Sequence, residues 1–158
     1  MIKLNHDSRG WIFKLKPNKF KIIKLVSRIH SFVYLLSNKH LGGKLANVEI
    51  LFLTTTGRNS GKPRTVPLAS IPYNGNYFVV SSFGGNSTEP NWLRNIRECS
   101  RVYIQNKSVS QGATATIISP SDTEYSKMWD RATETYYGFN NYKNATSRSI
   151  ALVMFNRN

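Results

Sequence analysis

The residues from Thr54 to Leu68, T-T-T-G-R-N-S-G-K-P-R-T-V-P-L, are of the types that bind an anion. Gly57 and Gly61 lack a Cβ, which allows backbone N–H groups to converge on a negatively charged group. The same stretch carries three cations, Arg58, Lys62 and Arg64. A guanidinium group binds phosphate as a planar two-pronged donor. The stretch is therefore predicted to be a phosphate-binding turn, with a basic turn exposed to solvent as the alternative. It is not a Walker loop, because the lysine spacing differs and no helix is predicted to follow.

No other group of residues has the spacing of a catalytic or metal site. The three histidines, His6, His30 and His40, all precede the predicted strands, and Cys99 is the only cysteine. A single cysteine excludes an internal disulfide and a cysteine-rich metal site. No Ser/His/Asp arrangement and no carboxylate pair falls near the predicted turn. We therefore predict no metal site.

Strands must position the turn on both sides. Residues 48–56 are β-branched and apolar almost throughout, which indicates a strand buried on both faces. Residues 64–73 and 77–82 flank Asn74-Gly75, a pair that favours a tight hairpin because both positions accept positive φ. The first of these strands has three prolines in or beside it, Pro63, Pro67 and Pro72. Because proline cannot donate to a strand ladder, we predict an edge or bulged strand.

Helices and further strands follow in alternation. Pro90 is predicted to begin a short helix that carries Trp92. Residues 101–105 and 109–118 form a second predicted hairpin, and residues 150–155 a closing strand. Ser119-Pro120-Ser121 is predicted to start another helix, with Glu124 completing a capping box. The predicted fold class is α+β, mainly β, as a small antiparallel barrel with appended helices.

Charge is distributed unevenly along the chain, which has a net charge of +14 and a mean hydropathy of −0.38. Residues 1–45 hold ten Lys or Arg against Asp7, a net charge of +9, and residues 46–158 hold the remaining +5. Residues 19–37 have the period of an amphipathic helix with a basic face. This helix either packs on the domain or lies in an anionic membrane surface. We expect a basic N-terminal segment, 1–45, and one globular domain, 46–158.

Several separated motifs resemble the deazaflavin-dependent nitroreductase family. The motifs are Gly42-Gly43, Leu53 to Arg58, Ser60 to Thr65 with Pro67-Leu68, Ser81 to Gly85, Pro90 to Trp92 with Asn95, the strand start Arg101-Val102, and Tyr136 to Phe155. The resemblance implies an antiparallel split β-barrel of the FMN-binding type. It also implies that coenzyme F420, a deazaflavin, is the cofactor. Reduced F420 would transfer a hydride to an electrophilic acceptor: a quinone, an enone or a nitroaromatic compound.

The resemblance assigns a role to each matching position. It implies that the coenzyme's phosphate and tail contact the turn, at Arg58, Ser60 and Arg64, and Lys62 is a further cation there. It implies that Pro67 lines the ring site, that the deazaflavin lies against Ser82, Gly84 and Gly85, and that Trp92 and Asn95 of the following helix contact the cofactor. The substrate pocket would be shaped by Tyr136, Phe139 and Tyr142. Tyr136 or Tyr142, or a bound water, would supply the proton. Trp92 and the aromatic residues have core packing as their alternative role.

Two positions depart from the family's pattern. Asn59 and Phe83 stand where many relatives carry lysine, so FMN is kept as an alternative cofactor. A basic nucleic-acid-binding barrel is the alternative from another class, although no nucleic-acid motif is present. We expect a cytoplasmic location, because the N-terminus lacks the pattern of a secretory signal. Attachment to the inner face of a membrane and pairing as a homodimer are left open.

Overall fold

A computed structural model describes residues 44–45 and 48–157 of the 158-residue chain. The strands are β1 Lys44–Leu45, β2 Val48–Thr56, β3 Pro63–Tyr73, β4 Asn76–Val80, β5 Arg101–Gln105, β6 Ser110–Ile118 and β7 Leu152–Arg157. The helices are the 3₁₀ turn η1 Phe83–Gly85, α2 Asn91–Glu98, α3 Tyr125–Thr135 and α4 Gly138–Asn144. The amphipathic helix predicted over residues 19–37 lies outside the described residues. Within them, no helix has the length and apolarity needed to cross a membrane.

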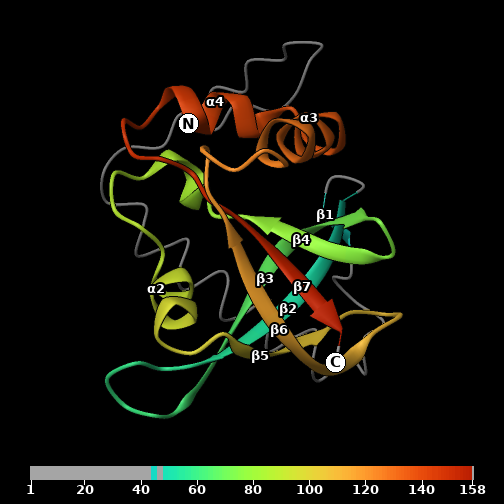
Figure 1. The fold of residues 1–158 in the computed structure, drawn as a ribbon, viewed down its shortest axis with the longest axis vertical. Coiled ribbons are helices and arrows are strands. Elements are labelled where there is room, and N and C mark those ends of the chain that lie inside the picture. Colours follow the sequence, from blue (N-terminus) through green and yellow to red (C-terminus); the bar gives the residue numbers. More distant parts are fainter. Residues whose placement is uncertain (1–43, 46–47, 158) are drawn as a thin grey trace, which may run out of the picture.

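The strands form an antiparallel barrel (Figure 1). Neighbouring strands follow the order β2, β3, β4, β7, β6 and β5, and β5 pairs back with β2 to close the sheet. The predicted split barrel, mainly β with helices between strands, is confirmed. Both predicted hairpins are present as well, and Asn74 and Gly75 adopt φ of 49° and 76° between β3 and β4.

Strand β3 changes partner half-way along its length. Residues 63–69 pair with β2, whereas residues 70–73 pair with β4. The edge strand predicted from the prolines was therefore wrong for β3 as a whole, because it has a neighbour on each side. The prediction holds locally, since Pro63 and Pro67 are registered against β2 alone and Pro72 against β4 alone. A strand that pairs on one side at a time tolerates a missing N–H.

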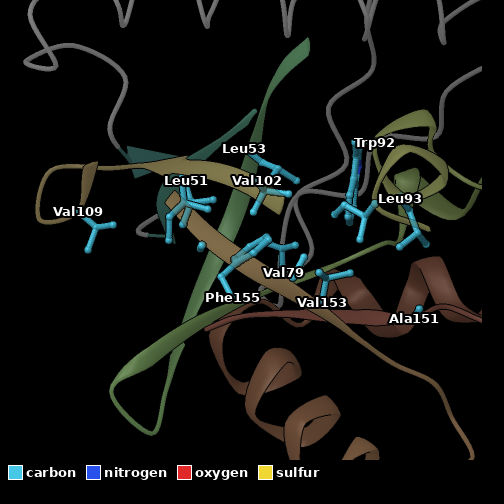
Figure 2. Packing of buried hydrophobic residues seen from close by; sticks show 14 residues of the cluster. Leu51, Leu53, Val79, Trp92, Leu93, Val102, Val109, Ala151, Val153 and Phe155 are labelled. Carbon is cyan, nitrogen blue, oxygen red and sulfur yellow. The ribbon is translucent and has the colours of Figure 1, made fainter. Parts of the chain in front are cut away.

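Two hydrophobic clusters hold the barrel and its helices together. The first fills the barrel and continues into α2, and Figure 2 shows Trp92 and Leu93 of α2 beside Leu53 and Val102. The second lies between the outer face of the sheet and helices α3 and α4. Helix α3 buries the four residues expected for its apolar side, Tyr125, Met128, Trp129 and Ala132. Helix α2 therefore packs its apolar side against the cluster inside the barrel, and α3 and α4 lie against the outside of the sheet.

The start of α3 differs from the prediction. The helix begins at Tyr125 and no side chain caps it, so the capping box of Ser121 and Glu124 is absent. A tight turn stands there instead, in which Asp122 N–H donates to Ser119 O at 2.9 Å and Ser119 N–H donates to Asp122 Oδ2 at 2.5 Å. An Asp side chain that binds nearby backbone competes with helix formation, and the helix begins three residues later than predicted.

Candidate functional site

The turn between β2 and β3 is closed by its own backbone. Gly57 N–H donates to Lys62 O at 2.9 Å, and Gly61 N–H donates to Gly57 O at 2.7 Å. Gly61 has a φ of 65°, which glycine adopts without strain. Position 57 is also crowded, because a Cβ there would lie 2.9 Å from Ser60 Oγ and 3.1 Å from Lys62 O, so glycine fits it best. The predicted strand-turn-strand is therefore present, and its basic side chains are exposed.

Asn95 joins the turn to α2. Its side chain is 5% exposed, and its Oδ1 accepts from the backbone N–H and from the Nη1 of Arg58, each at 3.2 Å. Its Nδ2 donates to Thr55 Oγ1 at 3.0 Å. All these partners belong to the turn or to the end of β2. Asn95 thus fixes the Arg58 guanidinium at the base of the turn, and its direct contact with the cofactor stays a prediction.

A shallow groove runs beside the turn, between the end of β2 and the start of β5. Its volume is about 260 Å³, and it is lined by Thr54, Thr55, Thr56, Gly61, Pro63, Arg101, Val102 and Tyr103. The groove opens because the registered pairs of β2 with β5 end at Thr54 and Tyr103. It places a further exposed cation, Arg101, next to the turn. Sequence analysis treated Arg101 only as the start of a strand.

The loop after β4 has an unusual backbone. Phe83, Gly84 and Gly85 have φ of 47°, 64° and 77° in succession. Gly84 is exposed and a Cβ built on it would meet no atom within 4 Å, so the loop presents an open surface. Gly85 faces α4 instead, where a Cβ would lie 2.8 Å from Ala145 Cβ and 3.1 Å from Tyr142 O. Gly84 is therefore open to a ligand, whereas Gly85 is packed against the end of α4.

Three aromatic rings gather on and beside α4. The Tyr136 ring meets Phe139 edge to face with centroids 5.3 Å apart, and the hydroxyls of Tyr136 and Tyr142 lie 3.3 Å apart. Gly138 makes room for this arrangement, because a Cβ there would collide with the Tyr136 ring. Sequence analysis had no helix here, although it singled out all three aromatic residues. The structure brings them together next to the Ser82–Gly85 loop.

The three rings differ in their access to a substrate. Phe139 is 4% exposed and belongs to the outer hydrophobic cluster, while Tyr136 and Tyr142 are half-buried. Burial raises the pKa of Tyr142 far above its ordinary value, and the hydrogen bond with Tyr136 adds to this rise. A phenol with a raised pKa stays protonated and donates a hydrogen bond, but it is a weaker acid than free tyrosine. The neighbouring Tyr137 is 60% exposed and was not singled out.

The remaining predicted ring contacts are more enclosed than expected. Trp92 is 8% exposed and packs in the barrel core (Figure 2), and Ser82 is buried. Pro67 is half-buried on β3, opposite Phe52 of β2. The core alternative therefore describes most of the Trp92 ring. Cofactor contacts of these three residues stay predictions, and for Trp92 they are limited to a small part of its surface.

The elements that carry the candidate residues follow one another along one side of the barrel. Figure 1 shows the β2–β3 turn, then α2, then η1, with α4 beyond η1. The two ion pairs among the described residues join Arg97 to Glu89 and Arg131 to Glu134. Within that part of the chain no carboxylate neutralises the cations of the turn. No cluster of three or more His, Cys, Asp or Glu is found there either.

This arrangement fits a long, phosphorylated cofactor. The cationic turn suits an anionic group, and the open, glycine-containing loop suits a flat ring lying against backbone. The two tyrosine hydroxyls offer hydrogen bonds next to that loop. The identity of this cofactor follows from the protein family that the chain matches. The model of the F420H(2)-dependent quinone reductase family matches residues 26–156.

The chain belongs to the F420H2-dependent quinone reductase family. An F420H(2)-dependent quinone reductase of Mycobacterium tuberculosis is 30% identical over 132 residues, which cover 82% of this chain and 89% of the relative. A solved F420-H2-dependent reductase is 33% identical with a TM-score of 0.60, over 67% of this chain and 92% of its own. A second solved structure, described as a domain-swapped dimer, is 30% identical with a TM-score of 0.62, over 79% and 97% of the two chains.

Family membership confirms the main predictions. The protein is an F420-dependent oxidoreductase, and coenzyme F420 rather than FMN is its cofactor. A haem-storage protein of Vibrio cholerae, 14% identical with a TM-score of 0.54 over 69% of this chain and 81% of its own, shares the fold alone. The substitutions at Asn59 and Phe83 therefore do not remove the chain from the F420 family. The roles of the individual site residues stay predictions.

Proposed function

We propose that this protein reduces a quinone at a site formed by the β2–β3 turn, the Ser82–Gly85 loop and the tyrosine pair. In this proposal the turn binds the phosphate and tail of F420 through Arg58, Ser60, Lys62 and Arg64. The loop supports the deazaflavin ring, and the acceptor lies beside Tyr136 and Tyr142. The observation that carries the proposal is the position of η1 between α2 and α4 (Figure 1), because η1 contains Gly84, where a Cβ would meet no atom within 4 Å.

The cofactor supplies the reaction's hydride when it is bound in its reduced form. The protein's part is to hold ring and acceptor face to face and to favour the charge that develops on the acceptor oxygen. The Tyr136 and Tyr142 hydroxyls are hydrogen-bonded at 3.3 Å, so one hydroxyl donates to the other and the second can donate toward the carbonyl oxygen of the acceptor. Because the pKa of Tyr142 is raised, we assign it hydrogen-bond donation and expect water to supply the proton.

Steady-state reduction of a short-chain quinone tests the proposal. Tyr142→Phe and Tyr136→Phe should each lower kcat about tenfold, the equivalent of one hydrogen bond of about 1.4 kcal/mol. F420 affinity should be unchanged in both variants. Tyr137→Phe is the matched control, because it removes an exposed hydroxyl from the same segment. Equal kcat values for all four proteins would remove the tyrosines from the mechanism, and faster turnover of a nitroaromatic or an enone than of any quinone would correct the acceptor class.

The basic N-terminal segment would bring this activity to a lipid-soluble acceptor. We propose that residues 19–37 form an amphipathic helix on the anionic inner face of the membrane, and that the barrel of residues 46–158 remains in the cytoplasm. The pattern of apolar and basic residues supports this proposal. Co-sedimentation with anionic liposomes should be lost in a chain that starts at Gly42. Equal sedimentation of both chains, or of neither, contradicts it.

Pairing of two chains is the remaining proposal about assembly. The domain-swapped dimer among the solved relatives supports a homodimer. Sedimentation velocity of the full chain should then give one species of twice 18.0 kDa. A species of one chain mass at all concentrations contradicts the proposal.

A further inference from the structure

Arg148 forms hydrogen bonds with the backbone at both ends of the Ser82–Gly85 loop. It lies in the segment between α4 and β7, far from the loop in sequence. Its Nη2 donates to Ser81 O at 2.7 Å and to Ser82 O at 2.9 Å, and its Nε donates to Asn86 O at 3.0 Å. One guanidinium group thus binds the chain both before and after the three residues with positive φ.

The same segment makes further contacts with the loop. Thr146 Oγ1 donates to Asn86 O at 3.4 Å, and the backbone N–H of Arg148 donates to Thr146 Oγ1 at 3.3 Å. Arg148 Nη1 donates to Ser149 O at 3.2 Å, which fixes the guanidinium to the backbone of its own segment. The Arg148 guanidinium is therefore held by its own segment through Ser149 O, and it holds the loop through three other carbonyls.

The loop needs such support because its backbone is strained. Phe83 has a Cβ and yet adopts a φ of 47°, a conformation that persists only where surrounding contacts impose it. The loop's own bonds, Gly85 N–H to Ser82 O at 2.9 Å and Asn86 N–H to Phe83 O at 3.2 Å, close two successive turns. Arg148 donates to the carbonyls of Ser81, Ser82 and Asn86, so it holds both ends of these turns.

We infer that Arg148 is a positioning residue, which holds the Ser82–Gly85 loop in the shape that receives the deazaflavin ring and fixes it relative to α4. The inference rests on the proposed function, because it assumes that the ring lies on this loop. It explains how Gly84 can stay open to a ligand while Gly85 packs on Ala145 and Tyr142. It also connects the loop with the segment that carries the two tyrosine hydroxyls.

Lysine could not replace Arg148 in this role. The guanidinium group presents several N–H donors in one plane and in fixed directions, whereas a lysine ammonium is a single compact charge. Three of the carbonyl partners, those of Ser81, Ser82 and Asn86, approach two different nitrogens of the fork. A lysine would keep the charge and lose the geometry.

F420 affinity of Arg148→Ala and Arg148→Lys tests the inference, with Arg131→Ala as the control. Arg131 is exposed on α3 and pairs with Glu134, so its loss should leave F420 binding unchanged. Both Arg148 variants should keep the far-ultraviolet circular dichroism of the wild type and bind F420 at least tenfold more weakly. Millimolar guanidinium, but not ammonium at the same ionic strength, should restore binding to Arg148→Ala.

Each outcome decides the matter. Binding within twofold of wild type in Arg148→Lys would overturn the positioning role, and this variant decides alone if Arg148→Ala does not fold. Weaker binding that guanidinium does not restore in a folded Arg148→Ala would also overturn it. A wild-type protein that fails to bind F420 would overturn the proposed function and the inference together, whereas normal wild-type binding with unaffected variants overturns the inference alone.

Discussion

The β2–β3 turn and the Ser82–Gly85 loop are two glycine-containing segments that the sequence marks in the same way, yet they are held by different means. The turn is closed by hydrogen bonds between residues at most five apart, from Gly57 to Lys62. The loop depends on Arg148 and on contacts with α4, more than fifty residues along the chain. The turn is thus built locally, and the loop is built by the fold.

Because of this difference, we expect the turn and the loop to respond differently to substitution. The turn exposes charge and can be changed at its surface with little effect on folding. The loop has a fixed shape, so we expect changes in its support to alter that shape and, if the deazaflavin ring lies there as proposed, to weaken cofactor binding. Asn95 shares features of both regions, because its side chain is buried in the fold and also forms a hydrogen bond with the turn. Substitutions in the loop, in the turn and at Asn95 distinguish effects on stability from effects on F420 binding.

Gly85→Ala should have the largest effect on stability. The new Cβ would lie 2.8 Å from Ala145 Cβ at a φ of 77°. Left-handed backbone and overpacking together should cost about 2–5 kcal/mol of unfolding free energy. Gly84→Ala is the matched control, because it has the same backbone strain without the clash and should cost about 1–2 kcal/mol. Urea unfolding measures both variants, and equal losses would show that the loop does not depend on its packing against α4.

Arg64→Ala should weaken F420 binding and leave folding unchanged. A charge-assisted hydrogen bond contributes about 1.5–3 kcal/mol, so the Kd should rise about ten- to a hundredfold. Because the side chain is exposed, the urea midpoint should stay near that of the wild type. Lys107→Ala removes an exposed cation at the β5–β6 hairpin and serves as the control. A loss of folding in Arg64→Ala would give this residue a structural role.

Asn95→Ala should affect both stability and binding. The change leaves Thr55 Oγ1 without its donor and frees the Arg58 guanidinium. The loss of these buried hydrogen bonds should cost about 1–3 kcal/mol of unfolding free energy. F420 titration should show a weaker complex as well, while Asn91→Ala, at the exposed start of α2, should show neither effect. Unchanged binding in a destabilised Asn95→Ala would mean that the turn does not need α2.

Alkaline pH should loosen the α3 and α4 side of the molecule by a smaller amount. Burial raises the pKa of Tyr125 to about 12 from an unfolded value of 10.0, and its hydroxyl donates to Ile150 O at 2.8 Å. Above pH 10 the unfolded chain releases a proton that the folded chain keeps. Stability is therefore full below pH 10 and falls between pH 10 and 12. Urea midpoints at pH 9, 10 and 11 should fall less in Tyr125→Phe, and parallel curves would contradict this.

Much of the fold could be predicted, because its signals are local. The β-branched, apolar run of residues 48–56, the Asn74-Gly75 hairpin and the apolar side of α3 each depend on short-range preferences. Helix α4 was missed, since its seven residues, G-F-N-N-Y-K-N, contain too few apolar positions for a helical period. The capping box failed because Asp122 offered its neighbours a competing hydrogen bond.

The candidate site could be predicted only in part. Its glycines, cations and tyrosines stand in motifs that can be recognised along the chain. Arg148 stands alone in a polar loop, and only the folded structure brings it to Ser81, Ser82 and Asn86. The burial of Trp92 and Asn95 likewise depends on how α2 docks on the barrel. Contacts between distant segments carry no local signal.

Titration of the wild-type protein with oxidised and reduced F420, followed by F420 fluorescence and with FMN as the control, tests the central claim most directly. The cationic turn and the open loop predict a micromolar or tighter Kd for F420 and much weaker binding of FMN, which lacks the acidic tail. Weakening of the F420 complex by added salt should follow if, as proposed, the exposed arginines and the lysine of the turn bind the phosphate. An absence of F420 binding at micromolar concentration, or tighter binding of FMN, would contradict the account.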